Sequence, residues 1–407
     1  MDFDTDILIA GGGLNGTTLA LALASAGFSV SLVDPVAIKT RKNARFDGRS
    51  YALSLGSQRV LAALGLWAEL APKAQPILDI KVTDGRAGEG PSPFVLHFDH
   101  TEIEEGPMGY MVEDRYLRPA LLGAISATDI RQITGPKLVS EVRDETGVTA
   151  TLDTGGTFRA RVLIGCDGRM SGVAARAGIT HMRWSYGQTA LVCAIGHERP
   201  HNGIAHQFFM PPGPLAILPL TGNRASIVWS ETTERADEIQ TMSDADYLDF
   251  LRPRFGDFLG EISLAGDRFS YPLGLSFAHR FIADRTALVG DAAHAVHPIA
   301  GQGLNAGLKD VAALAEVLTD ASRRGEDIGR TDVLERYERW RRFDAATLAM
   351  ATDGFNRLFS NDNPFLRLTR DLGLGLTNAL PSLRRGFIRE AAGLTGDLPR
   401  LARGKSL

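Results

Sequence analysis

The chain has 407 residues, enough for two or three domains, and it is 44% hydrophobic and 23% charged, as is usual for a globular protein with a large core. Its formal net charge of −4 gives no reason to expect a nucleic acid as a partner. Cys166 and Cys193 are too few for a disulfide framework and fit a reducing compartment, so we expect a cytoplasmic protein.

A long uncharged stretch covers residues 7–33 and resembles a membrane anchor at first sight. Glycines and polar residues interrupt it from residue 11 onward, whereas a spanning helix needs about 20 continuous apolar residues. A secretory signal needs a basic start, but the chain opens with Asp2, Asp4 and Asp6. We therefore expect neither an anchor nor a signal peptide.

The same stretch predicts a β-α-β unit. Residues 6–10 are typical of a short buried strand, and residues 14–26 predict a helix that ends at Gly27. Residues 28–33 predict a second strand, which an Asp-Pro pair terminates.

The turn of this unit carries a glycine pattern. Gly11, Gly13 and Gly16 fit G-x-G-x-x-G between a strand and a helix, and Asp34 follows about 20 residues on. Gly11 permits the tight turn, Gly13 lets the backbone approach a pyrophosphate, and Gly16 lets helix and strand pack closely. The pattern in this context predicts dinucleotide binding, but it does not distinguish FAD from NAD.

The middle of the chain predicts further strands and helices. Residues 119–126 are typical of an apolar helix, and residues 148–152, 161–165 and 225–230 of strands. The strand at 161–165 leads into an Asp-Gly turn at Asp167, which either serves a ligand or only caps the following helix. Residues 323–342, densely and alternately charged, predict a solvated helix.

A second glycine-rich segment follows the predicted strand at residues 286–289. Gly290 and Asp291 come first, and then a proline and close-set glycines open an alanine-rich helix. Such a helix start brings bare backbone N–H groups and the positive end of a helix dipole to a flat, partly anionic ligand. His294 and His297 have metal-ligand spacing but no nearby carboxylate or cysteine partner on a regular helix, so we expect no metal.

With these motifs in order, the chain resembles the FAD-dependent aromatic monooxygenases of the p-hydroxybenzoate hydroxylase type, and more narrowly the ubiquinone-biosynthesis hydroxylase family. One departure is Asp34, where family members commonly carry Glu; the shorter acid can still reach a ribose. The matching segments are His297-Pro298-x-Ala300-Gly301-Gln302-Gly303-x-Asn305-x-Gly307-x-x-Asp310, Asp47-Gly48-Arg49 with Ala52-Leu53-Ser54, Val112-Glu113-Asp114-Arg115, and Gly393-Leu394 with Gly396-Asp397-Leu398-Pro399.

The resemblance implies an α/β fold: a Rossmann-like FAD-binding domain, an inserted β-sheet substrate domain and a helical C-terminal region. Their borders follow from where the motifs fall and are uncertain by several residues. The FAD-binding domain would take residues 1–75, 108–178 and 270–350, the substrate domain 76–107 and 179–269, and the C-terminal region 351–407.

The resemblance also implies roles for the matching residues in holding FAD. Gly11, Gly13, Gly16 and Asp34 would hold its ADP half, and Asp167 matches a position implicated in FAD and nicotinamide binding. Arg49 and Arg115 match arginines along the pyrophosphate and ribityl chain, although Arg49 could also be an ordinary surface arginine.

The second glycine-rich segment would hold the flavin half. Asp291, after Gly290, would bind the ribityl hydroxyls. The helix start at Gly303, Leu304 and Asn305 would point at the pyrimidine edge of the flavin and stabilise the anionic reduced form. Pro298 would lie beside the reacting face.

The implied reaction is the hydroxylation of a prenylated phenol on the path to ubiquinone. NADPH or NADH would reduce FAD, and O₂ would give a flavin hydroperoxide that attacks the ring in a site that excludes water. The single dinucleotide fingerprint fits a class without a dedicated nicotinamide domain. We cannot name a base for the phenol from the sequence, and Trp184, Tyr186 and Phe208 either line the substrate pocket or belong to the core.

A prenylated substrate lives in the bilayer. The mixed apolar and basic residues 364–393 therefore suit a peripheral contact with the inner face of the cytoplasmic membrane or with a biosynthetic complex, unless they form an ordinary helix packed on the domain. The alternative function is a hydroxylase of a small soluble phenol or a salicylate-type aromatic. A NAD-dependent dehydrogenase, a flavin-dependent halogenase and a flavoprotein scaffold without activity explain less of the chain.

Overall fold

The computed structural model describes residues 2–41, 45–86, 90–298, 301–359 and 380–407. Its first sheet grows from the predicted β-α-β unit, which consists of β1 (Thr5–Ala10), α1 (Leu14–Ser25) and β2 (Val30–Asp34). β1 and β2 are parallel and almost fully buried, as strands covered on both faces should be. The Leu, Ile and Val residues of these strands form the centre of the largest hydrophobic core.

The parallel part of this first sheet has the strand order β19-β11-β1-β2-β8. Parallel strands place their carboxyl ends at one edge, where open α/β sheets bind ligands. The added strands are β8 (Arg131–Thr134), β11 (Thr157–Gly165) and β19 (Thr286–Leu288), with antiparallel β9 (Leu138–Arg143), β10 (Val148–Leu152) and β18 (Ile282–Ala283) at the margins.

The second sheet is built along one long strand, β12 (His181–His197), and has the order β20-β17-β12-β15-β14-β13-β5-β6. At its end, β20 (His294–Ala295) comes from the second glycine-rich segment and so ties that segment to this sheet. The other strands are β5 (Asp79–Arg86), β6 (Gly90–Asp99), β13 (Ile204–Met210), β14 (Gly213–Leu220), β15 (Arg224–Thr232), β16 (Ile262–Leu264) and β17 (Phe269–Ala278).

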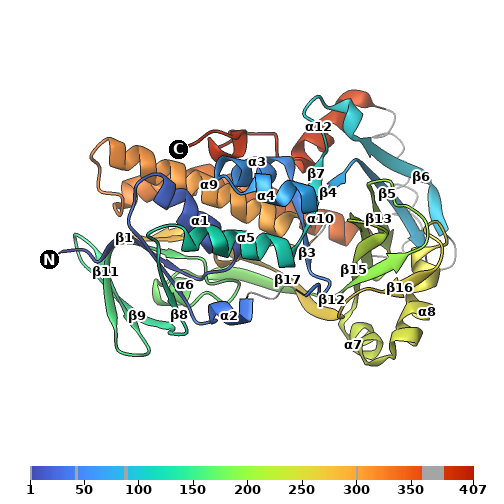
Figure 1. Cartoon of the computed structure of the whole chain (residues 1–407), viewed down its shortest axis with the longest axis horizontal. Coiled ribbons are helices and arrows are strands. Elements are labelled where there is room, and N and C mark those ends of the chain that lie inside the picture. Colours follow the sequence, from blue (N-terminus) through green and yellow to red (C-terminus); the bar gives the residue numbers. More distant parts are fainter. Residues whose placement is uncertain (1, 42–44, 87–89, 299–300, 360–379) are drawn as a thin grey trace.

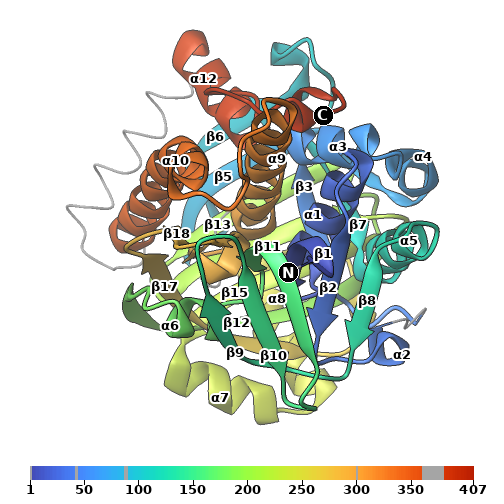
Figure 2. The same ribbon diagram turned by 90° about the vertical axis from the view of Figure 1, so that its left-hand side faces the viewer.

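Helices cover both sheets. α9 (Gln302–Arg323) and α10 (Thr331–Phe359) run along one side of the molecule, and α7 (Thr233–Thr241) and α8 (Asp244–Phe255) cover the opposite side of the second sheet (Figures 1 and 2). A third, small sheet consists of β3 (Ser50–Ser54), β7 (Gly109–Glu113) and β4 (Gln75–Ile77). The remaining helices are α2 (Ile38–Arg41), α3 (Leu55–Ala63), α4 (Trp67–Leu70), α5 (Asp114–Ser126), α6 (Gly172–Arg176) and α12 (Pro381–Ala391).

The prediction of one solvated helix over residues 323–342 was wrong. α9 ends at Arg323, the chain turns at Gly325 with φ +72°, and α10 begins only at Thr331. One face of α10 is also buried, because Tyr337 and Arg341 lie in the interior. Alternating charge is compatible with a loop or a half-buried helix, so it did not locate the break. The helix predicted over residues 119–126 likewise begins earlier, at Asp114.

Within the described residues, no helix is both long enough and apolar enough to cross a bilayer.

Candidate functional site

Three loops that the sequence singled out converge at the carboxyl edge of the first sheet. The glycine turn follows β1, the Asp167 turn follows β11, and the Asp291 turn follows β19. Cys166 N–H donates to the carbonyl oxygen of Ala10 at 2.7 Å, and Val289 N–H donates to that of Gly165 at 2.9 Å. The fold therefore places these loops side by side, although they are far apart in sequence.

Two glycines of this turn leave no room for a side chain, and the third faces open space. A Cβ on Gly11, whose φ is +105°, would come within 2.3 Å of the carbonyl oxygen of Cys166, and a Cβ on Gly16 within 1.9 Å of that of Gly11. A Cβ on Gly13 would meet no atom within 4 Å. Gly13 begins α1 without a side-chain cap, and the first turn of the helix has no acid, so this helix end suits an anion.

Asp34, at the end of β2, binds the backbone of this turn through its side chain. Its buried carboxylate accepts hydrogen bonds from the backbone N–H groups of Gly12, at 2.5 Å, and Val36, at 2.7 Å. The acid that the sequence pattern required therefore lies directly beside the glycines.

The start of α9 repeats the design of α1. Gly301 begins the helix with φ +64° and no side-chain cap, and the first turn again has no acid. A Cβ on Gly303 would meet nothing within 4 Å. Two uncapped helix ends thus contribute to one site, and α1 and α9 pack directly against each other.

Asn15 joins the two glycine-rich segments. A Cβ on Gly290 or on Gly307 would lie 2.3 Å from Asn15 Nδ2, so the Asn15 side chain fits only because both positions are glycine. Packing holds this side chain, since its buried Oδ1 has no hydrogen-bond partner within the described residues. Residues near 11–34 and near 290–305 therefore fold together, as the dinucleotide hypothesis requires.

Asp310 anchors the turn at Gly290 from inside α9. Its carboxylate accepts from Gly290 N–H at 3.0 Å, from His294 Nε2 at 2.7 Å and from Arg341 Nε at 2.8 Å, and it is fully buried. Burial alone would raise the pKa of Asp310, but His294 and Arg341 outweigh burial and hold this pKa below its usual value. The group is therefore a charged anchor at neutral pH.

Asn305 anchors the start of α9 to the small sheet. Its Oδ1 accepts from Ser54 N–H at 2.9 Å and Ser57 Oγ at 2.7 Å, and its Nδ2 donates to the carbonyls of Ala52, at 2.9 Å, and Gly301, at 3.1 Å. These bonds use both donors and both acceptor positions of the side-chain amide. The side chain positions the helix end, which leaves the backbone around Gly303 and Leu304 to meet a ligand.

The two turn acids differ. Asp167 accepts from Ser171 Oγ at 2.5 Å and from Val173 N–H at 3.0 Å, so it caps α6, the simpler of its two predicted roles. Asp291 is exposed at the site, and the surrounding protein raises its pKa by desolvation.

The two predicted arginines are both held by acids. Arg49 pairs with Asp47 at 2.7 Å and is partly exposed beside Asp114, at 3.6 Å. Arg115 pairs with Glu113 at 2.6 Å and lies against the ring of Phe46. Arg115 therefore lies in the first turn of α5, directly after β7, and Arg224 of β15 pairs with the same Glu113 at 2.6 Å.

Next to Pro298, a group of polar side chains lies between the two sheets. His297 is fully buried, and its ring meets the ring of Tyr186 edge-on, with the centroids 5.2 Å apart. Trp184 belongs to the same strand as Tyr186, whereas Phe208 packs in a separate core on the far side of the second sheet. Ile299 and Ala300 of the motif lie outside the described residues.

The two histidines have different surroundings. His294 pairs with Asp310 at 2.7 Å, and neither ring nitrogen of His297 has a hydrogen-bond partner among the described residues. Within the described ranges, the group with metal-ligand spacing is Asp79, Asp99 and His100, which is only partly buried and belongs to the second sheet.

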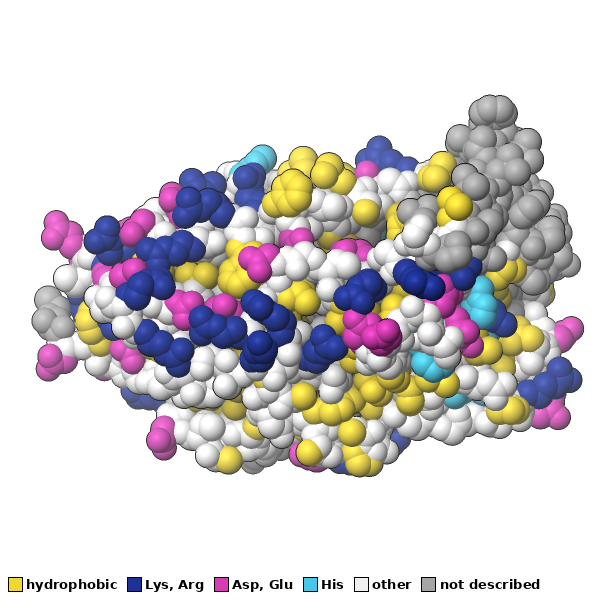
Figure 3. Space-filling view, turned by 90° about the horizontal axis from the view of Figure 1, so that it is seen from above, with side chains coloured by type: hydrophobic (Ala, Val, Ile, Leu, Met, Phe, Trp, Pro, Cys, Tyr) yellow, Lys and Arg dark blue, Asp and Glu magenta, His cyan; other side chains and the backbone are white. Residues whose placement is uncertain are grey.

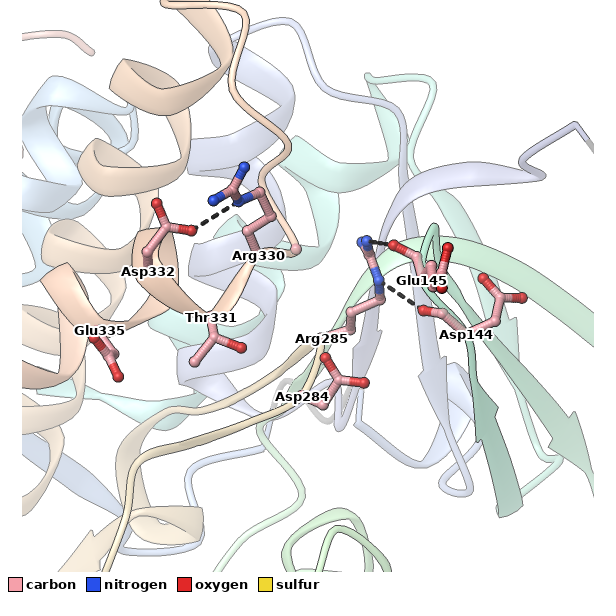
Figure 4. Close-up of a pocket in the computed structure, with 9 residues that line it drawn as sticks. Asp144, Glu145, Asp284, Arg285, Arg330, Thr331, Asp332 and Glu335 are labelled. Carbon is pink, nitrogen blue, oxygen red and sulfur yellow. Dashed lines mark hydrogen bonds and ion pairs between the residues drawn. The ribbon is translucent and has the colours of Figure 1, made fainter.

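A cleft of about 630 Å³ lies elsewhere, between the β9–β10 hairpin and the start of α10 (Figure 4). Acidic side chains such as Asp284 and Glu335 line it. Arg285 also lines it and donates a hydrogen bond from Nε to the Asp144 carbonyl at 3.0 Å. It contains no predicted site residue, so its size does not make it the functional site.

Three contributors to the site were missed by the sequence prediction: Asn15, Asp310 and Arg341. Asn15 lies within the glycine pattern and Asp310 is the last residue of the second motif, so the motifs could have indicated both. Arg341 carried none, since its partner lies 31 positions away on another helix.

Comparison with known proteins agrees with this geometry. Residues 4–352 match the family described as FAD binding domain. A ubiquinone hydroxylase of Rhodospirillum rubrum, UbiL, is 46% identical over 99% of this chain and 93% of its own length. The 3-demethoxyubiquinol 3-hydroxylase of Escherichia coli is 34% identical over 96% of this chain and 99% of its own. Human COQ6, a ubiquinone biosynthesis monooxygenase, is 31% identical over 95% and 92%.

Among solved structures, p-nitrophenol 4-monooxygenase from Pseudomonas putida is similar, with a TM-score of 0.79 over 97% of this chain and 99% of its own. At 19% sequence identity, this likeness establishes the fold alone.

Proposed function

The chain belongs to the ubiquinone-biosynthesis hydroxylase family of FAD-dependent monooxygenases, and from this membership we propose that it hydroxylates the aromatic ring of a prenylated phenol on the path to ubiquinone. FAD is the cofactor, and NADPH or NADH and O₂ are the co-substrates. The observation that carries the proposal is the full-length match to three ubiquinone hydroxylases. A hydroxylase of small soluble phenols on the same fold is the weaker reading.

The residues at the carboxyl edge fit FAD. A helix start without a side-chain cap and without an acid in its first turn suits an anionic ligand, and the starts of α1 and α9 meet both conditions. The space beside Gly13 and Gly303 lets a ligand approach the backbone closely. We assign the ADP half to Gly11, Gly13, Gly16 and Asp34, and the flavin half to Asp291 and the backbone of Gly303 and Leu304.

When bound, FAD would supply the redox chemistry of ring hydroxylation, which is hydride acceptance from a nicotinamide and activation of O₂. The start of α9 contributes partial positive charge, which stabilises negative charge on a neighbouring ligand. Asp310, in α9, fixes the position of the turn at Gly290 relative to this helix through a hydrogen bond. Buried His297 and half-buried Pro298 exclude water from the same side.

We extend the proposal to the other residues with expected roles. Arg49 forms an ion pair with Asp47 and Arg115 with Glu113. Each arginine can therefore contribute to FAD binding only if it contacts the cofactor while keeping this pair or after breaking it. Asp167 supports the site through the cap that it gives α6.

A peripheral contact with the cytoplasmic face of a membrane is the further part of this proposal. Of the predicted segment 364–393, residues 364–379 lie outside the described residues. In its described part, Arg385 and Phe387 of α12 are exposed, and Phe343 and Met350 are exposed on α10. Figure 3 shows exposed hydrophobic side chains on one face of the molecule, among basic and acidic ones. Such a mixture suits an interface with anionic lipid, where a prenylated substrate is found.

The test of function uses purified holoenzyme. We expect a flavin absorption spectrum and NAD(P)H oxidation that a prenylated phenol stimulates more strongly than phenol or salicylate, with a hydroxylated product by mass spectrometry. Deletion in the native cell should accumulate a quinone intermediate that lacks one hydroxyl. Unchanged quinone, or equal turnover of small phenols, would favour the soluble-phenol reading. Co-sedimentation with anionic but not zwitterionic vesicles tests the membrane contact separately.

A further inference from the structure

The polar group next to Pro298 contains side-chain atoms that the protein itself does not satisfy. Trp184 Nε1, the Tyr186 hydroxyl, both ring nitrogens of His297 and Asp353 Oδ1 are all buried, and none of them has a partner in hydrogen-bonding geometry among the described residues. A buried polar group without a partner costs about 1–3 kcal/mol, so several in one place require an explanation.

These atoms come from three elements that meet at one point. Trp184 and Tyr186 come from β12, His297 from the loop before α9, and Asp353 from α10. Arg357 connects them, since it pairs with Asp353 at 2.9 Å and lies over the Trp184 ring at 5.8 Å. The Tyr186 and His297 rings are in edge-on contact, with their centroids 5.2 Å apart.

A β-bulge turns Tyr186 toward this point. The pairing of β12 with β17 shifts between Ser185 and Gln188, and Gly187 has φ +64°. Bulges next to active sites re-aim side chains in this way. The neighbouring polar groups are satisfied: Gln188 donates to the Pro212 carbonyl at 2.6 Å and accepts from Asn356 at 3.0 Å, which fixes α10 against β12.

The protonation states of the group are defined by burial. Desolvation lowers the pKa of His297 to about 4, so its ring is neutral and one nitrogen is an acceptor. Desolvation and the nearby Asp353 carboxylate raise the pKa of Tyr186, so its hydroxyl keeps its proton and can donate.

Resting on the function proposed above, we propose that His297, Tyr186 and Trp184 form the recognition site for the oxygen substituent of the aromatic ring. The substrate hydroxyl donates to the free acceptor nitrogen of His297, and Tyr186 and Trp184 donate to the oxygen. An acceptor on the phenolic proton increases electron density on the ring, which favours attack by an electrophilic oxygen. The site therefore takes phenols and rejects their ethers.

The test compares 2-geranylphenol with its methyl ether on the holoenzyme, with dissociation constants from the change in flavin absorbance. We expect the wild type to prefer the phenol by at least about fivefold, the range of one hydrogen bond. Tyr186→Phe and His297→Phe should each weaken phenol binding by about fivefold or more and change ether binding by less than about twofold. Because phenylalanine keeps the edge-on ring contact between positions 186 and 297, Tm should change little in either variant.

Tyr247→Phe is the matched control, since this tyrosine lies in the core on the far side of the second sheet with its hydroxyl 3.6 Å from Cys193 Sγ. It should leave the preference for the phenol unchanged. Variants that keep the wild-type preference, or that lose Tm together with affinity for both compounds, would overturn the assignment. A wild type that neither binds nor turns over the phenol would instead refute the proposed function on which the assignment rests.

Discussion

The base of the cofactor site and the polar group next to Pro298 are neighbours but are built in opposite ways. At the base, Asp310 and Asn305 use their hydrogen-bonding capacity on protein partners such as His294 and Ser57. Next to Pro298, Tyr186 and His297 have polar atoms for which the described residues provide no partner in hydrogen-bonding geometry. The first arrangement fixes the conformation of the loops around the cofactor site. The second leaves donors and acceptors available to a ligand.

This difference separates structural from ligand-binding polar residues without reference to any alignment. Both regions are buried, so burial does not distinguish them. Hydrogen bonding distinguishes Asp310 and Asn305 from Tyr186 and His297, because a satisfied group stabilises the fold and an unsatisfied one destabilises it unless a ligand or water compensates. Asn15 is the exception at the base, since packing holds its side chain.

The largest expected effect comes from Asp310→Asn, which removes the charge at the centre of the base. Breaking a fully buried ion pair costs about 3–5 kcal/mol of unfolding free energy, since Arg341 is left with only its second partner, Asp344. Denaturant unfolding and flavin content measure the loss. The control is Asp332→Asn, whose partner Arg330 is exposed, and which should cost less than about 1 kcal/mol. Equal losses would contradict the distinction.

The next effect is a pH dependence that the two regions should not share. The pKa of folded His297 is about 4, below the ordinary 6.5, so the unfolded chain binds the proton more tightly. Stability should therefore fall by about 2 kcal/mol as pH decreases from about 7 to 5, and His297→Phe should abolish that part of the slope. The folded pKa of Asp310 is lowered, so its contribution persists until the pH falls below its ordinary 3.8.

Unfolding curves at a series of pH values compare both variants with the wild type. The difference between wild type and Asp310→Asn should stay constant between about pH 7 and 5, whereas the difference for His297→Phe should change. His206 lies in another pocket, and desolvation also lowers its pKa to about 4, so His206→Phe should remove a separate contribution of similar size. A flat difference for His297→Phe would mean that water already reaches its ring.

The smallest expected effect tests the close packing at the base. Gly307→Ala adds a Cβ 2.3 Å from Asn15 Nδ2 and should cost about 1–2 kcal/mol, with lower flavin retention. Asn15→Ala in the same chain should recover most of that loss, because it removes the clashing atoms. Gly123→Ala in α5 is the control: its Cβ would meet nothing within 4 Å, so the change should stabilise by up to about 1 kcal/mol.

The parts of the fold that could be predicted from sequence are those with local causes. The β-α-β unit was confirmed because its strands are continuously apolar and its glycines serve contacts within a few residues or at the adjoining strand. The strand before Gly290 was confirmed for the same reason. The break between α9 and α10 was missed because nothing in the charge pattern marks a turn at residues 324–330.

The site could be predicted in outline but not in its partners. Asn305 was expected to meet the cofactor, yet its side chain bonds to Ser54 and Ser57, about 250 positions away. Trp184 and Tyr186 could not be separated from core residues, since the register shift that turns Tyr186 depends on how β12 pairs with β17. Such contacts follow from tertiary pairing, which a single sequence does not encode locally.

The uncapped starts of α1 and α9 have a consequence for the amount of protein in a cell. Two like-signed dipole ends held together leave the ligand-free chain less stable, and an anionic dinucleotide relieves this repulsion. Binding then stabilises by mass action, by about 2.7 kcal/mol at a free concentration one hundred times the dissociation constant. Limiting the supply of riboflavin should therefore shorten the lifetime of this chain before it limits its turnover number.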